Sequence, residues 1–165
     1  MPKTMMQLAI VQFFTWIAFF AMWIYTTSGI ALNTFGTTDK DSKIFQDAGD
    51  WVGVMFMVFN GVWAIVSFLL TIVAKKIGRK YTHMFCLIVG GIGLVSMLFI
   101  KTQNMLLVPM IGVGLAWSST LTMPYAILSG ALPANKMGFY MGVSMIIGGL
   151  MNFMVTDKKD EKIVH

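Results

Sequence analysis

The chain has 165 residues, of which 57% are hydrophobic and only 12% are charged, and its formal net charge is +5. The charges are concentrated between long uncharged runs, whereas a soluble domain of this size distributes charge over its whole surface. This pattern excludes a soluble globular domain and indicates an integral membrane protein. The basic residues lie beside hydrophobic runs, so we interpret them as neighbours of lipid headgroups and expect no nucleic-acid partner.

Five runs of the chain are long enough to cross a membrane as helices. A helix needs about 20 residues to cross a hydrocarbon core of ~30 Å. A lipid-facing backbone must satisfy its own hydrogen bonds, and no run alternates as barrel strands do. The sequence therefore predicts an all-α, polytopic transmembrane bundle over residues 1–155 and a charged, disordered tail over 156–165. The expected spans are 8–32, 51–74, 82–100, 105–128 and 137–155.

The fifth expected span, 137–155, is short and rich in glycine, so a surface or re-entrant segment is the alternative there. If the spans alternate, six basic residues lie on one side of the membrane and three on the other. The excess of lysine and arginine marks the cytoplasmic side, which predicts a cytoplasmic N-terminus. The larger group is Lys3, Lys75, Lys76, Arg79, Lys80 and Lys136, and the smaller is Lys40, Lys43 and Lys101.

Catalytic and metal-binding patterns are missing from the sequence. All seven acidic residues lie outside the expected spans, and the single cysteine, Cys86, has no partner for a disulfide or a ligand cluster. His83 is the one ionisable residue near a span, and we expect it to be interfacial, with no role in ion coupling. We therefore predict no enzyme, no catalytic residue, no metal site and no cofactor.

Polar and aromatic side chains share helical faces in three of the expected spans. With one residue every 100°, five residues of the first expected span fall within about 80° of one another, namely Gln12, Trp16, Phe19, Trp23 and Thr26. Indoles stack on the apolar face of a sugar ring, and amides and hydroxyls pair with its hydroxyl groups. The alternative is that these residues only hold helices together. The candidate cavity residues are Gln12, Trp16, Trp23, Thr26, Asn60, Trp63, Trp117 and Ser118.

The basic segment between the second and third expected spans resembles a loop found in each half of major facilitator superfamily transporters. Thr71 and Lys75 stand where that motif has its first glycine and its aspartate. The resemblance implies that the segment gates closure on the cytoplasmic side, with Lys76, Gly78, Arg79 and Lys80 as gating residues. The residues that match are Ala74, Lys76, Gly78, Arg79 and Lys80.

A second group of motifs resembles sugar:cation symporters of the glycoside–pentoside–hexuronide type and the related sucrose and maltose carriers. It comprises Met123–Ala126, Leu132–Pro133 and Lys136–Gly142, and the resemblance covers residues 1–142. It implies the C-terminal half of a twelve-helix transporter, truncated or internally deleted, in a bacterial inner membrane. The implied partners are lipid, a sugar, and a second transporter half or another copy of the chain.

Two functions are compatible with these observations. The first is a partial secondary-active transporter that, when complete, takes up an oligosaccharide or glucoside by symport. The second is a small integral membrane subunit without transport activity, or an inactive remnant of a transporter.

Overall fold

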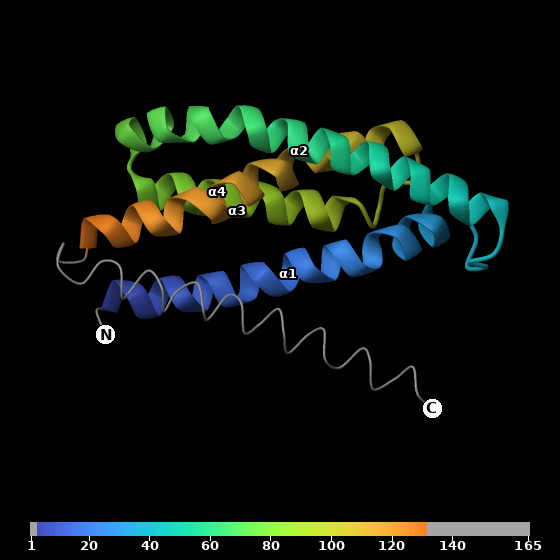
Figure 1. Ribbon diagram of the computed structural model, residues 1–165, viewed down its shortest axis with the longest axis horizontal. Coiled ribbons are helices and arrows are strands. Elements are labelled where there is room, and N and C mark those ends of the chain that lie inside the picture. Colours follow the sequence, from blue (N-terminus) through green and yellow to red (C-terminus); the bar gives the residue numbers. More distant parts are fainter. Residues whose placement is uncertain (1–2, 132–165) are drawn as a thin grey trace. The chain divides into compact units, whose positions relative to one another are not determined.

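The computed structural model describes residues 3–131, and every regular element within that range is a helix. The described residues form four α-helices, which are labelled in Figure 1, and one short 3-10 helix. This confirms the predicted all-α fold class. The elements are α1 (Lys3–Asn33), α2 (Lys43–Ile77), α3 (Arg79–Ser96), η1 (Gln103–Leu106) and α4 (Leu107–Ala131).

Three stretches of the described residues are long and apolar enough to cross a membrane, namely Met6–Asn33, Lys43–Ile77 and Gln103–Gly130. The predicted number of about five spans was therefore stated too precisely. Helix α3 is not among the three, because its 18 residues include Arg79 and Lys80 in the first turn. The fifth expected span, 137–155, and the predicted tail lie outside the described residues.

The contacts of the chain divide it into two compact units. One unit contains the described residues 3–20 and 124–131, which are the first part of α1 and the last part of α4. The other contains Ala21–Met123, and we call it the central unit. It holds the end of α1, all of α2, α3 and η1, and most of α4.

Local sequence signals determine where α2 begins and ends. The Ser42 side chain caps its first turn by accepting a hydrogen bond from the Phe45 N–H, with a donor–acceptor distance of 3.2 Å. At the other end, Gly78 adopts φ 99°, a conformation that favours glycine, and its N–H donates to the carbonyl of Ala74 at 3.0 Å. Helix α3 starts at the next residue, so a single glycine forms the turn between two helices.

Small residues allow α4 to approach both α3 and α2 closely. Gly93 of α3 lies against the backbone of Pro109, and a Cβ added to Gly93 would be 2.8 Å from that carbonyl oxygen. On another face of α4, a Cβ on Gly114 would be 2.8 Å from the Phe59 carbonyl oxygen of α2. In the central unit, α4 therefore packs directly on the other two helices, as Figure 1 illustrates.

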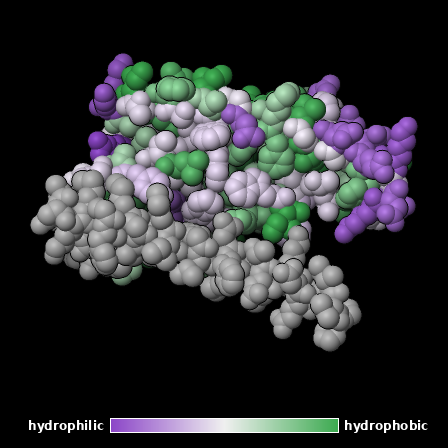
Figure 2. Space-filling model, viewed as in Figure 1, coloured by the Kyte–Doolittle hydropathy of each residue, from purple (hydrophilic) through white to green (hydrophobic). Residues whose placement is uncertain are grey.

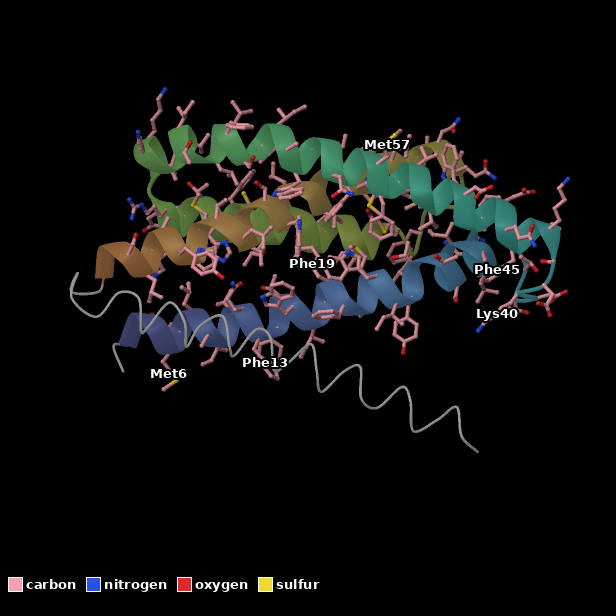
Figure 3. The ribbon with its side chains drawn as sticks, viewed as in Figure 1. Met6, Phe13, Phe19, Lys40, Phe45 and Met57 are labelled. Carbon is pink, nitrogen blue, oxygen red and sulfur yellow. The ribbon has the colours of Figure 1, made fainter. Side chains whose placement is uncertain are left out.

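At the end of the central unit opposite the α2–α3 turn, side chains of α1 and α2 donate hydrogen bonds to backbone carbonyls between α3 and α4. The Asn33 amide donates to Ile100 at 3.2 Å and reaches the carbonyls of Met97 and Leu98 at 3.4 Å. The Trp51 indole N–H donates to the Gln103 carbonyl at 3.1 Å. Figure 3 labels Lys40 in the loop at this end of α2, and Met57 farther along the helix, on its exposed side. The bonds of Asn33 and Trp51 therefore join the ends of α1 and α2 to the connection between α3 and α4.

Candidate substrate site and cytoplasmic turn

An aromatic cluster lies where α1, α2 and α4 meet in the central unit. The Trp23 and Trp117 rings are in edge contact, with ring centroids 5.1 Å apart and an angle of 73° between their planes. Phe59 of α2 lies on the Trp117 ring at 6.2 Å. Trp117 is 9% exposed and Trp23 is 37% exposed, so the Trp117 indole is buried in the cluster and the Trp23 indole lies at its exposed side. We call Trp23, Phe59 and Trp117 the aromatic cluster.

Three buried hydroxyl groups follow Trp117 on α4, at Ser118, Ser119 and Thr120. The Thr120 hydroxyl donates to the Ala116 carbonyl of its own helix at 2.8 Å. The Ser118 hydroxyl is fully buried and has no hydrogen-bond partner among the described residues. A buried hydroxyl without a partner is costly, and water or a ligand group commonly supplies the missing bond. Ser118 is therefore a candidate to bond to a ligand or to water.

His83 is packed between α3 and α4. It is only 5% exposed, and its Nδ1 lies 2.8 Å from the Ser119 Oγ of α4, which joins α3 to α4. Cys86, one turn farther along α3, is buried as well. The His83 Nε2 has no partner among the described residues. His83 is buried because it lies on the same face of α3 as Gly90 and Gly93, the face that packs on α4.

The other candidates in the central unit lie on α1 and α2. The Thr26 hydroxyl donates to the Met22 carbonyl of its own helix. The Asn60 amide is exposed and donates to the Phe56 carbonyl at 2.7 Å, so its own helix satisfies one of its two N–H groups. Trp63 is exposed. The structure therefore brings Trp23 and Trp117 together, whereas the Asn60 amide is turned to the backbone of its own helix.

Gln12 and Trp16 lie in the other unit. Trp16 is half-buried and stacks on Phe20, one turn farther along α1, with ring centroids 5.8 Å apart and planes 28° apart. Gln12 is half-buried as well.

Two residues of this region were missed in the sequence, Phe59 and Ser119. Phe59 lies three positions after Phe56 and four before Trp63, which puts it about 40° around the helix from Trp63, at the border of the face that carries Asn60 and Trp63. Ser119 had no distinguishing signal, because three hydroxyl residues follow one another and the sequence does not tell which of them faces α3.

The predicted gating residues surround the turn between α2 and α3. Lys75 and Lys76 are in the last turn of α2, Gly78 forms the turn, and Arg79 and Lys80 open α3. The four basic side chains are exposed. Gly78 has the positive φ that the single-residue turn requires, which is a physical reason for the glycine at this position of the motif.

The aromatic cluster and the buried hydroxyls of α4 offer surroundings in which a neutral polar molecule could be held. The central unit offers indole and phenyl faces beside a buried hydroxyl, and its carboxylates all lie in 39–50. No group of three or more potential metal ligands occurs among the described residues. A neutral ligand with both an apolar face and hydroxyl groups matches this environment.

Comparison with known proteins gives one result that bears on function. A family model described as Major Facilitator Superfamily matches residues 2–156, which is almost the whole chain. No match was found among curated proteins or solved structures. Members of the matched family are transporters rather than enzymes. With its long apolar helices, the chain is an integral, multi-pass membrane protein, and it belongs to the major facilitator superfamily of transporters.

Proposed function

We propose that the chain is part of a secondary-active transporter that takes up a sugar, an oligosaccharide or a glucoside, by symport when complete. The N-terminus would lie in the cytoplasm and the chain in a bacterial inner membrane, in agreement with the distribution of basic residues. A second transporter half, or a second copy of the chain, would complete the carrier.

The observation that carries this proposal is the aromatic cluster with Ser118 directly after Trp117. A pyranose ring has an apolar face that stacks on an indole, and its hydroxyl groups both donate and accept hydrogen bonds. The edge contact of Trp23 and Trp117 presents two indoles with 73° between their planes, and the Ser118 hydroxyl has no partner among residues 3–131. A sugar would therefore satisfy Ser118 while it covers the partly exposed Trp23 ring.

Binding can be measured on the purified full chain in lipid nanodiscs from its tryptophan fluorescence. Maltose, sucrose and aryl glucosides are titrated separately, and we expect saturable quenching by at least one of them. Trp23→Ala should abolish the quenching. Ser118→Ala should weaken affinity by about tenfold, the effect of losing one hydrogen bond in a buried site.

Two matched variants control for indirect effects. Trp51→Phe removes an indole that bonds to the Gln103 carbonyl, away from the aromatic cluster, and should leave affinity unchanged. Thr122→Ala removes a hydroxyl that donates to the Ser118 carbonyl of its own helix, and it should leave affinity unchanged. No saturable binding by helical, monodisperse protein would reject the sugar site and favour a subunit or remnant without transport activity. Uptake by vesicles under an imposed proton or sodium gradient then tests symport.

A further inference from the structure

The imidazole of His83 lies in the contact between α3 and α4 and has no part in the proposed function. Only 5% of the residue is exposed, and its Nδ1 lies 2.8 Å from the Ser119 Oγ. The second ring nitrogen, Nε2, is buried and has no hydrogen-bond partner among residues 3–131. The ring therefore holds the two helices together through one nitrogen, while the other has nothing to bond to within the described part of the chain.

The contact that encloses His83 is close along both helices. Farther from the α2–α3 turn, a Cβ added to Gly112 of α4 would be only 3.0 Å from the Val89 carbonyl oxygen of α3. Cys86 follows His83 by one turn of α3 and is 2% exposed. Helices in such close contact exclude the hydration shell that a charged ring has in water. The surroundings of His83 therefore suit a neutral imidazole.

The charged groups next to His83 along the chain are all positive. Arg79 and Lys80 precede it by four and three positions, which places them on its side of α3. Neither α3 nor α4 contains an acidic residue, and the carboxylates of the described residues all lie in 39–50. No carboxylate of these two helices can therefore pair with a charged His83. Besides Cys86, the titratable groups at this end of α2 and on α3 and α4 are Lys75, Lys76, Arg79, Lys80, Tyr81 and Tyr125.

A proton on His83 would be incompatible with this contact. The neutral ring has one donor and one acceptor, whereas the imidazolium has two N–H donors. Ser119 can accept a hydrogen bond from Nδ1, but the Nε2–H would have no acceptor among the described residues. A buried charge without a partner is strongly unfavourable. Figure 2 shows hydrophilic colour concentrated toward the ends of the central unit, so the charged ring would reach polar surroundings next to the α2–α3 turn.

We propose that His83 is a proton-binding site that controls the contact between α3 and α4. When the ring is neutral, its bond to Ser119 holds the helices together, and when the ring is protonated, the two helices separate next to the α2–α3 turn. Only the separated state accepts the proton, so the contact is stable at neutral pH. It weakens as the pH falls below the ordinary pKa of histidine, ~6.5. This response to acid is independent of the sugar site and of the coupling ion.

The single cysteine of the chain reports the separation, because Cys86 is buried in the same contact. Its rate of reaction with dithiodipyridine is measured on the full chain in lipid nanodiscs, relative to a cysteine peptide at the same pH. If only the separated state binds the proton, its population should rise about thirtyfold from about pH 7.5 to about pH 5. We expect the relative reaction rate of Cys86 to rise by the same factor.

The chain has two histidines, so His165→Gln is a matched control for His83→Gln. His165→Gln should show the same rise in reaction rate as the unmodified chain. In His83→Gln, whose amide can still bond to Ser119, the rate should not depend on pH. Circular dichroism checks the helix content of each variant. A rise that persists in His83→Gln, or a constant rate in the unmodified chain, would overturn the proposal.

Nuclear magnetic resonance of the chain labelled only at its histidine nitrogens tests the same site without a substitution at His83. His165→Gln assigns the two sets of ring signals. We expect the His83 ring to remain neutral for as long as Cys86 is unreactive, and to become an imidazolium only where Cys86 reacts. An imidazolium at His83 while Cys86 stays unreactive would overturn the proposal, because the closed contact would then hold the charged ring.

Discussion

Alanine in place of Gly93 would introduce a methyl group into the contact between α3 and α4. The new Cβ would lie 2.8 Å from the Pro109 carbonyl oxygen and 3.4 Å from Cγ2 of Val113. Heavy atoms in good contact are about 3.5 Å apart or more, so the helices would have to separate by roughly 0.7 Å. The close neighbour is a backbone atom within α4, so it cannot move aside as a flexible side chain would.

The expected loss of stability in Gly93→Ala follows from comparison with a substitution at a neighbouring glycine. Gly91 lies two positions earlier on α3, and a Cβ there meets no atom within 4 Å. Alanine is favoured over glycine in a helix by up to about 1 kcal/mol, and this gain is common to Gly91→Ala and Gly93→Ala. The difference between the two variants therefore isolates the clash, for which overpacking typically costs about 1–3 kcal/mol.

The measurement is the free energy of unfolding of the full chain in detergent, from titration with sodium dodecyl sulfate followed by circular dichroism. We expect Gly91→Ala to equal or exceed the unmodified chain in stability, and Gly93→Ala to be less stable than Gly91→Ala by about 1–3 kcal/mol. Equal stability of the two variants would refute the reasoning, because α3 and α4 would then not approach each other closely at Pro109.

Two further substitutions test single contacts in the central unit. Ser119→Ala removes the bond to His83 Nδ1, and by the range for hydrogen bonds between membrane helices should lower the free energy of unfolding by about 0.6–1.7 kcal/mol. Ser129→Ala, whose hydroxyl bonds to the Ala126 carbonyl of its own helix, serves as the control, and equal effects would argue against the α3–α4 bond. Gly78→Ala should cost about 1–3 kcal/mol because alanine disfavours φ 99°, although the nearest side-chain atom is 3.8 Å away. In the same titration Gly61→Ala, which meets no neighbouring atom, should be neutral or stabilising; a neutral Gly78→Ala would contradict the strained turn.

The sequence was sufficient to determine the environment and fold class of this protein. Long uncharged runs leave little choice, because hydrocarbon penalises both charge and unpaired backbone groups. Single residues also determined local features, such as the glycine between α2 and α3 and the serine that caps α2. The number of spans was less certain, because the basic residues that open α3 shorten its apolar part.

Only the tertiary structure decided which helical faces meet. Trp23 and Trp117 are 94 positions apart (117 − 23), and periodicity placed each on a face of its own helix without indicating that the two faces coincide. The burial of His83 likewise depends on glycines in α3 and small residues in α4 that bring the two helices together. The period of a helix determines the angles between its own side chains. Which side of the helix faces a neighbouring helix depends on how the surfaces of the two helices pack together.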